Sequence, residues 1–246
     1  MTQHPTMEKM QQMKLTGMLR AFKQTMETNF TNNLTVDELI AYLIDAEWEE
    51  RHNRKLNRLL NNAHFRYRAS IEHIDFTQPR ELDKNLLLRL SDCEWLRKTE
   101  NVLITGATGT GKSFIASALG HQACTEGFRV MYFNSLKLFS KLKFAKANGT
   151  YDRELRKIKQ QKLLILDDFG LHPIDEQSKL MLLELLEDRY GVSSTLIVSQ
   201  FPVKSWYEMI NNPTVADAIL DRIVHNSHQI ELIGESMRKT LKSNSG

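Results

Sequence analysis

The segment from Gly106 to Ser113 reads Gly-Ala-Thr-Gly-Thr-Gly-Lys-Ser and matches the spacing G-x-x-x-x-G-K-[ST]. Glycines at this spacing let the backbone turn tightly and aim successive N–H groups inward, at a helix N-terminus whose partial positive charge favours phosphate. Lys112 would reach the β- and γ-phosphates of a bound nucleotide, and the Ser113 hydroxyl would ligate Mg²⁺. A glycine-rich surface turn is the alternative, disfavoured because a strand-like run precedes the segment and a helix-like run follows it. The candidate nucleotide-binding residues are Gly106, Ala107, Thr108, Gly109, Thr110, Gly111, Lys112, Ser113 and Phe114.

A second apolar run, from Lys162 to Gly170, contains two adjacent carboxylates near its end, Asp167 and Asp168. A buried parallel strand opens onto the ligand crevice at its carboxyl end, which is where these carboxylates are expected. We predict that Asp167 holds Mg²⁺, directly or through water. Asp168, on the other side of the strand path, would be free to polarise the water that attacks the γ-phosphate. An ordinary strand end is the alternative, and the preceding phosphate loop disfavours it.

The composition is that of an ordinary globular protein. The chain has 246 residues, of which 41% are hydrophobic, enough for one sizeable α/β domain and a smaller appendage. No apolar run approaches the roughly 20 residues of a membrane span, and the N-terminus lacks a charged-then-apolar signal pattern. Cys93 and Cys124 lie far apart in the sequence, and neither belongs to a metal-type pair. We therefore expect a reduced, cytoplasmic protein.

Basic residues are concentrated in two stretches, although the net charge is only +3. Residues 51–68 contain six basic and no acidic residues, and residues 129–162 contain ten basic and two acidic residues. Two such stretches favour contact with a polyanion over more than one surface. Solvated basic helix faces are the alternative. The candidate DNA-contacting residues are Arg51, Arg54, Lys55, Arg58, Lys137, Lys141, Lys143 and Lys146.

The first third of the chain has a helical pattern. Apolar residues recur at helical spacing from about residue 7 to 70, and Thr35 with Glu38 is typical of a capping box. The periodicity breaks around residues 76–79, which indicates a linker. We predict a helical N-terminal domain over residues 1–75, a linker region over 76–97 and a nucleotide-binding domain over 98–246.

From about residue 98 onward, strand-like apolar runs alternate with helix-like segments. This alternation predicts an α/β fold, with a parallel five-stranded sheet covered on both faces and ligands at the carboxyl ends of the strands. Thirteen residues follow the last predicted strand, so we expect no sizeable C-terminal helical lid. The predicted strands are Asn101–Thr105, Arg129–Phe133, Lys162–Asp167, Thr195–Ser199 and His228–Ile233.

Four further segments are informative, and the last two of them are more specific than the phosphate loop or the strand that ends in Asp167 and Asp168. They are the start Met-Lys-Leu-Thr-Gly-Met at 13–18, Asp-Asp-Phe-Gly at 167–170, Ala-Asp-Ala-Ile-Leu-Asp-Arg at 216–222 and Gly-Glu-Ser-Met-Arg at 234–238. With these segments the chain closely resembles, over essentially its whole length, the IstB family of ATP-binding helper proteins in bacterial insertion-sequence transposition. The DnaC helicase loaders are the nearest relatives of that family.

The resemblance implies a P-loop AAA+ core that binds ATP and Mg²⁺ and hydrolyses ATP slowly, as a switch. Such proteins form homo-oligomers, a ring or a helical filament, on duplex DNA in the bacterial cytoplasm, and they recruit or activate the transposase of the same insertion sequence. The N-terminal domain would contact DNA and transposase. Arg222 would be an arginine finger for a neighbouring subunit, Arg238 a second sensor arginine, and Ser199 or Gln200 the sensor 1 residue that orients the attacking water.

Two other functions fit parts of the pattern. A replicative helicase loader has the same fold, but its N-terminal module binds a helicase, whereas the basic stretch 51–68 suits DNA and transposase better. A P-loop kinase of a small metabolite needs an arginine-bearing lid and a substrate pocket. Such a kinase would gain nothing from ten basic residues between the two strands of the nucleotide site.

Overall fold

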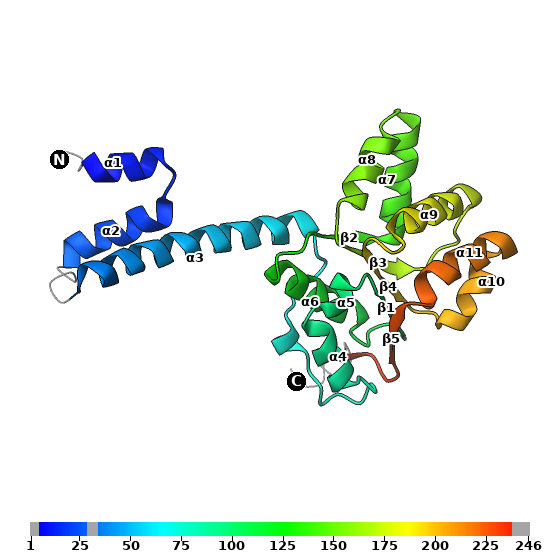
Figure 1. Ribbon diagram of the computed structural model, residues 1–246. Helices are drawn as coiled ribbons and strands as arrows, with labels where there is room; N and C mark the ends of the chain where they lie inside the picture. The colour runs from blue at the N-terminus through cyan, green and yellow to red at the C-terminus, as the bar shows by residue number, and fades with distance from the viewer. Residues whose placement is uncertain (1–4, 29–33, 238–246) are drawn as a thin grey trace, which may run out of the picture. The chain divides into compact units, whose positions relative to one another are not determined.

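The computed structural model describes residues 5–28 and 34–237 of the chain. By their internal contacts the residues form two compact units, 1–58 and 59–246. The smaller unit is helical, and the larger unit contains the sheet (Figure 1). No helix among the described residues is both long enough and apolar enough to cross a bilayer.

The smaller unit consists of α1 (Pro5–Gln12), α2 (Thr16–Thr28) and most of α3 (Val36–Ala63). The expected capping box is confirmed, because the Thr35 backbone N–H donates to Glu38 Oε2 at 2.7 Å and the Glu38 N–H donates to Thr35 Oγ1 at 3.3 Å. The buried Glu47 carboxylate of α3 accepts hydrogen bonds from the N–H groups of Gly17 and Met18, at 2.9 and 3.2 Å. It thereby caps the N-terminus of α2. Gly17 is required there because a Cβ would collide with the Ala46 carbonyl oxygen.

The helical pattern ends earlier than the sequence suggested. Helix α3 stops at Ala63, and His64 has a left-handed backbone with φ of 58°, which ends the helix. The prediction of helix to about residue 70 was therefore wrong for residues 64–70. The segment expected as a linker, 76–97, contains α4 (Lys84–Ser91) and α5 (Glu94–Arg97). Its buried Leu87, Leu90 and Trp95 make it part of the larger unit rather than a spacer.

The larger unit contains a five-stranded parallel sheet, as predicted. The strands are β1 (Asn101–Gly106), β2 (Val130–Asn134), β3 (Leu163–Phe169), β4 (Ser194–Ser199) and β5 (Ser227–Leu232). Their order across the sheet is β2-β3-β4-β1-β5. Strand β4 pairs in parallel with β1 on one side and with β3 on the other, so the carboxyl ends of these three strands lie next to one another at one edge of the sheet. The order therefore brings the phosphate loop after β1 close to the carboxylates of β3.

Helices cover the two faces of the sheet in separate layers. On one face α6 (Lys112–Thr125) packs against β1, β2, β3 and β4, and contacts α4 and the short helix η2 (Ile71–His73) on its outer side. The other face is covered by α7 (Ser135–Ala147), α8 (Tyr151–Lys159), α9 (Glu176–Arg189) and α11 (Pro213–Val224). Two short helices, η3 (Val203–Ser205) and α10 (Trp206–Ile210), connect β4 to α11. Helices α7 and α8 lie side by side (Figure 1).

Side chains of the central strands alternate between these layers. Leu164 and Leu166 belong to the core under α7 to α11, whereas the Cδ1 atom of Ile165 lies 2.8 Å from where a Cβ at Gly120 of α6 would be. Both sets are fully buried, as expected for a parallel strand covered on both faces. The burial fixes the register of β3 and hence the position of the carboxylates at its end.

Candidate nucleotide site

The phosphate loop connects β1 to α6, and its glycines allow the backbone path. Gly109 has φ of 87°, a conformation that favours glycine, and a Cβ there would collide with the Ser236 side chain. The Met237 N–H donates to the Gly109 carbonyl at 2.9 Å. Ser236 and Met237 of the Gly-Glu-Ser-Met-Arg segment therefore pack directly on the loop. Arg238, the last residue of that segment, lies outside the described residues.

Lys112 directs its ammonium back into the loop. Its Nζ donates to the Ala107 carbonyl at 2.7 Å, and the residue is only 7% exposed. Burial lowers the pKa of Lys112, while the charges of Asp167 and Asp168 act in the opposite direction. A buried ammonium at a helix N-terminus is suited to bind phosphate oxygens.

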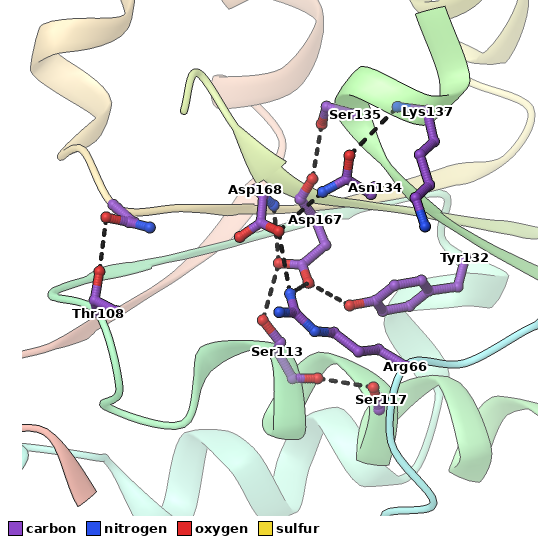
Figure 2. Close-up of polar contacts among 11 residues, drawn as sticks. Arg66, Thr108, Ser113, Ser117, Tyr132, Asn134, Ser135, Lys137, Asp167 and Asp168 are labelled. Atoms are coloured by element: carbon purple, nitrogen blue, oxygen red, sulfur yellow. Dashed lines mark hydrogen bonds and ion pairs between the residues drawn. The ribbon is translucent and has the colours of Figure 1, made fainter. Parts of the chain in front are cut away.

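Ser113 and Asp167 are in contact, as the sequence predicted for a shared metal. Ser113 Oγ donates to Asp167 Oδ1 at 3.0 Å. Two ligand oxygens in adjacent positions on an octahedral Mg²⁺, each about 2.0–2.1 Å from the metal, lie about 2.9 Å apart. This oxygen pair therefore fits Mg²⁺ with little movement. The Tyr132 hydroxyl also donates to Asp167, and Ser135 Oγ holds the Asp167 carbonyl at 2.9 Å (Figure 2).

Asp168 does not lie on the opposite side of the strand from Asp167, contrary to expectation. The pairing of β3 with β4 is irregular between Leu166 and Phe169, and Asp168 has φ of 57°. This local turn brings both carboxylates to one side, where Arg66 Nη1 donates to Asp167 Oδ2 at 3.0 Å and to Asp168 Oδ2 at 3.1 Å (Figure 2). Asn134 Nδ2, at the end of β2, donates to the same Asp168 oxygen at 2.9 Å. Asp168 is therefore held by two donors rather than free.

Of the two sensor 1 candidates, only Gln200 faces the site. Ser199 is buried, and its hydroxyl donates to the Phe169 carbonyl at 2.8 Å and accepts from the Phe201 N–H at 3.1 Å. Gln200 lines the cavity beside the phosphate loop, and its Oε1 accepts a hydrogen bond from Thr108 Oγ1 at 2.8 Å. The Ser199 hydroxyl therefore bonds only to backbone groups among the described residues, whereas the Gln200 side chain can reach a ligand in the cavity.

The cavity at this edge of the sheet has a volume of about 520 Å³, within the range of ligand pockets. The phosphate loop forms one wall. Asp168 and Gln200, both expected from the sequence, also line the cavity. The lining residues that were not expected from the sequence are Arg66, Tyr67, His73, Asp75, Arg80, Leu171 and Met237. Arg80 donates to the carbonyls of Thr110 and Asp75, at 2.9 and 2.6 Å. Among the described residues its buried Nε has no hydrogen-bond partner.

Arg66 was counted only as part of the basic stretch 51–68, yet the structure places it in the site. Burial works against the charge of the guanidinium, but the hydrogen bond to Asp167 and the neighbouring charges outweigh it and raise the pKa of Arg66 above its ordinary value. A basic residue between two aromatic residues, Phe65 and Tyr67, was the signal that could have separated it from the surface residues of α3.

Arg222 lies at the opposite end of the sheet from the phosphate loop. Its carbonyl accepts from Asn101 Nδ2 at 3.1 Å, and Asn101 is the first residue of β1. The loop begins at Gly106, about 16 Å further along the strand at about 3.3 Å per residue. The guanidinium pairs with Glu187 and donates to the Ala218 carbonyl at 2.8 Å. Arg222 therefore does not contact the phosphate loop of its own chain.

The candidate DNA-contacting residues differ in how they are paired. Arg51 pairs with Glu47 at 2.7 Å, Arg54 bonds Thr16, Lys141 pairs with Glu154 at 3.0 Å and Lys143 pairs with Asp175. Hydrogen bonds from Lys157 and Lys141 lower the pKa of Glu154 to about 2. The remaining four candidates, whose side chains have no partner elsewhere in the described ranges, are Lys55, Arg58, Lys137 and Lys146.

Comparison with known proteins places this site in a family context. Residues 8–245 match the model of a family described as IstB-like ATP binding protein. A Sinorhizobium fredii protein, provisionally named as insertion sequence ATP-binding protein y4pL, is 44% identical over 245 residues, 100% of both chains. A Pseudomonas aeruginosa protein, provisionally named as the ATP-binding protein of insertion sequence IS21, is 30% identical and covers 87% of this chain and 80% of its own.

Solved structures share the fold at low sequence identity. The crystal structure of DnaI has a TM-score of 0.58 at 20% identity and covers 72% of this chain and 93% of its own. The crystal structure of the DnaC helicase loader has a TM-score of 0.51 at 17% identity and covers 71% and 98%. A DnaA structure bound to AMPPCP and single-stranded DNA has a TM-score of 0.58 at 17% identity and covers 74% and 57%. These structures confirm the expected α/β fold with a parallel five-stranded sheet.

Proposed function

The chain belongs to the IstB-like ATP binding protein family, and we propose that it is an ATP-dependent, DNA-binding AAA+ regulator of transposition. In this proposal it binds Mg·ATP, oligomerises on duplex DNA and recruits or activates the transposase of its insertion sequence. ATP hydrolysis to ADP and phosphate then acts as a switch. The observation that carries the proposal is the contact between Ser113 of the phosphate loop and Asp167 at the end of β3.

Different residues of the cavity would bind the nucleotide and promote its hydrolysis. The backbone of the phosphate loop and Lys112 would hold the β- and γ-phosphates, and Ser113 with Asp167 would hold the metal. Mg²⁺, when bound, neutralises charge on the phosphate oxygens. Asp168 would accept a proton from the attacking water, and Gln200 would orient that water. Arg66 Nη1 and Asn134 Nδ2 both bind Asp168 Oδ2, which has to be released before it can accept a proton, and this supports slow hydrolysis.

Arg222 would complete the site of a neighbouring subunit. The length of β1 separates it from its own phosphate loop, so action on its own nucleotide would need a large rearrangement. The pairing with Glu187 must open before the guanidinium can reach a γ-phosphate. ATP hydrolysis would therefore depend on assembly, which suits a switch that acts only on DNA.

The DNA contacts are best assigned to unpaired basic side chains. Lys141 and Lys143 already neutralise Glu154 and Asp175, whereas Lys137 and Lys146 of the same helix, α7, are exposed and lack a partner in the described parts of the chain. A phosphate contact by a paired lysine first has to break its ion pair. We therefore propose Lys137 and Lys146 in the larger unit, and Lys55 and Arg58 of α3, as the principal phosphate contacts.

A replicative helicase loader is the second candidate, supported by the structural similarity to DnaI and the DnaC helicase loader. The relatives at 30% identity and above are named for insertion sequences, which favours transposition. Both candidate functions belong in the bacterial cytoplasm. The buried thiols of Cys93 and Cys124, which are not joined in a disulfide, agree with a reducing compartment.

One experiment separates the two candidates. The tagged chain is incubated with Mg²⁺ and a non-hydrolysable ATP analogue on duplex or single-stranded DNA, and the transposase of the same insertion sequence and the host helicase are offered together. The proposal expects transposase to be retained, on duplex DNA, and only with nucleotide. Retention of helicase in place of transposase would favour the loader, and retention without nucleotide would contradict the switch.

A further inference from the structure

Arg66 binds the two carboxylates at the metal site, and on Asp167 it takes the oxygen next to the one that faces Ser113. Its Nη1 lies 3.0 Å from Asp167 Oδ2 and 3.1 Å from Asp168 Oδ2, so one nitrogen bridges the two carboxylates. Asp167 is fully buried, and the other carboxylate oxygen of Asp167 accepts from Ser113. One of the two negative charges at the end of β3 is thus already compensated by a side chain of the protein.

The backbone on both sides of Arg66 is fixed to the larger unit. The Phe65 ring meets the Tyr132 ring edge-on at 6.3 Å and lies so close to Gly120 that a Cβ there would collide with it. The Tyr67 ring packs on Phe114 at 6.2 Å. With both neighbours packed, Arg66 can change partners by rotating its side chain while the chain path stays in place. The side chain is 41% exposed and lines the cavity, so there is space for this rotation.

We propose that Arg66 is an internal competitor of the metal: it bridges Asp167 and Asp168 until Mg²⁺ binds, and then turns into the cavity. This inference rests on the proposed role of Asp167 as a metal ligand. Mg²⁺ and a guanidinium on adjacent oxygens of one buried carboxylate repel each other, because the local dielectric constant is lower than that of water. Arg66 therefore weakens metal binding when no nucleotide is present, and the negative charge of ATP offsets this effect.

Because of this competition, the site binds Mg²⁺ together with ATP more readily than Mg²⁺ alone. Polyphosphate adds negative charge that both the metal and the released guanidinium can contact. As long as Arg66 bridges the carboxylates, it occupies the Asp168 oxygen that Asn134 also binds, so this oxygen is not free to accept a proton from the attacking water. Removal of Arg66 from Asp168 is thus a step toward a hydrolysis-competent site.

The test uses metal binding by the full chain without nucleotide, with Mn²⁺ as the probe, measured by electron paramagnetic resonance. Arg66→Gln should bind Mn²⁺ about tenfold more tightly than the unmodified chain, since a hydrogen bond to a charged group typically changes an equilibrium by at least that factor. Arg68→Gln is the matched control, because Arg68 is exposed, two residues away and not in contact with either carboxylate. It should leave the affinity unchanged.

The unmodified chain provides a second readout, which decides the question if Arg66→Gln does not fold. Phenylglyoxal labels accessible guanidinium groups, and mass spectrometry gives the labelling rate of Arg66 relative to that of Arg68. Saturating Mn²⁺ should raise this ratio several-fold. Equal or weaker Mn²⁺ binding by Arg66→Gln, or a ratio that Mn²⁺ does not change, would overturn the proposal. Such a result would leave ATP binding at the phosphate loop intact, whereas loss of both Mn²⁺ and ATP binding in the unmodified chain would refute the proposed function itself.

Discussion

Replacement of Arg222 by alanine should separate ATP binding from ATP hydrolysis. The arginine lies at the start of β1 and the phosphate loop at its end, about 16 Å apart along the strand, so the variant keeps an intact nucleotide site. Arginine fingers contribute about 10³- to 10⁵-fold to hydrolysis, and we expect a loss of at least about 10³-fold. Because Arg222 is partly exposed and its ion pair with Glu187 is near the surface, the stability should change by only about 1 kcal/mol.

A mixture of Arg222→Ala and Lys112→Ala chains tests whether the finger acts between subunits. A productive interface needs an intact Lys112 on one subunit and an intact Arg222 on its neighbour. In a random equal mixture about one quarter of the interfaces combine both, so up to about a quarter of the unmodified activity should return.

The assay is phosphate release on duplex DNA at several mixing ratios, with mixed oligomers verified by differential tags. Arg89→Ala, which removes an exposed arginine on α4, is the control and should keep full activity. If Arg222→Ala alone hydrolyses ATP at the unmodified rate, or if verified mixed oligomers recover no activity, the assignment of Arg222 as a finger between subunits is wrong.

Four further outcomes are expected. Asp168→Asn keeps the left-handed backbone, because asparagine tolerates it, and should bind ATP, lose about 10²- to 10⁴-fold in hydrolysis rate and accumulate on DNA; an unmodified rate would exclude Asp168 as the base. Gln200→Ala should lower the hydrolysis rate by about 10²-fold. Ser199→Ala should instead cost about 1–3 kcal/mol in the free energy of unfolding, and the reverse order of effects in the two variants would reassign sensor 1. Loss of Lys137 and Lys146 should lower the slope of log affinity against log salt by about 0.9 for each contact, equally on unrelated duplexes, and an unchanged slope would place the DNA elsewhere.

The strands and the phosphate loop could be predicted because their signals are local. Each strand is an apolar run, and each predicted strand lies within two residues of the observed one, as for β3 at Leu163–Phe169. The contact between Ser113 and Asp167 followed from the rule that carboxyl ends of parallel strands meet at one edge. The capping box at Thr35 also involves only neighbouring residues.

The charges that hold the site together could not be predicted in the same way. Arg66 reaches Asp167 from 101 positions earlier in the chain, and the irregular end of β3 decides that both carboxylates face the same donor. The pairing of Lys143 with Asp175 likewise depends on how α7 packs beside α9. The residue types show that these side chains are charged, but only the folded structure shows which side chains they pair with.

The most direct test of the proposed function is the mass of the chain on a short duplex DNA, measured with and without Mg²⁺ and a non-hydrolysable ATP analogue. We expect a DNA-bound oligomer with nucleotide, which is lost in Lys112→Ala because phosphate binding fails. Arg222→Ala should still assemble, since it retains its own nucleotide site. A chain that remains monomeric on DNA with nucleotide, or a Lys112→Ala variant that assembles like the unmodified chain, would contradict the central claim.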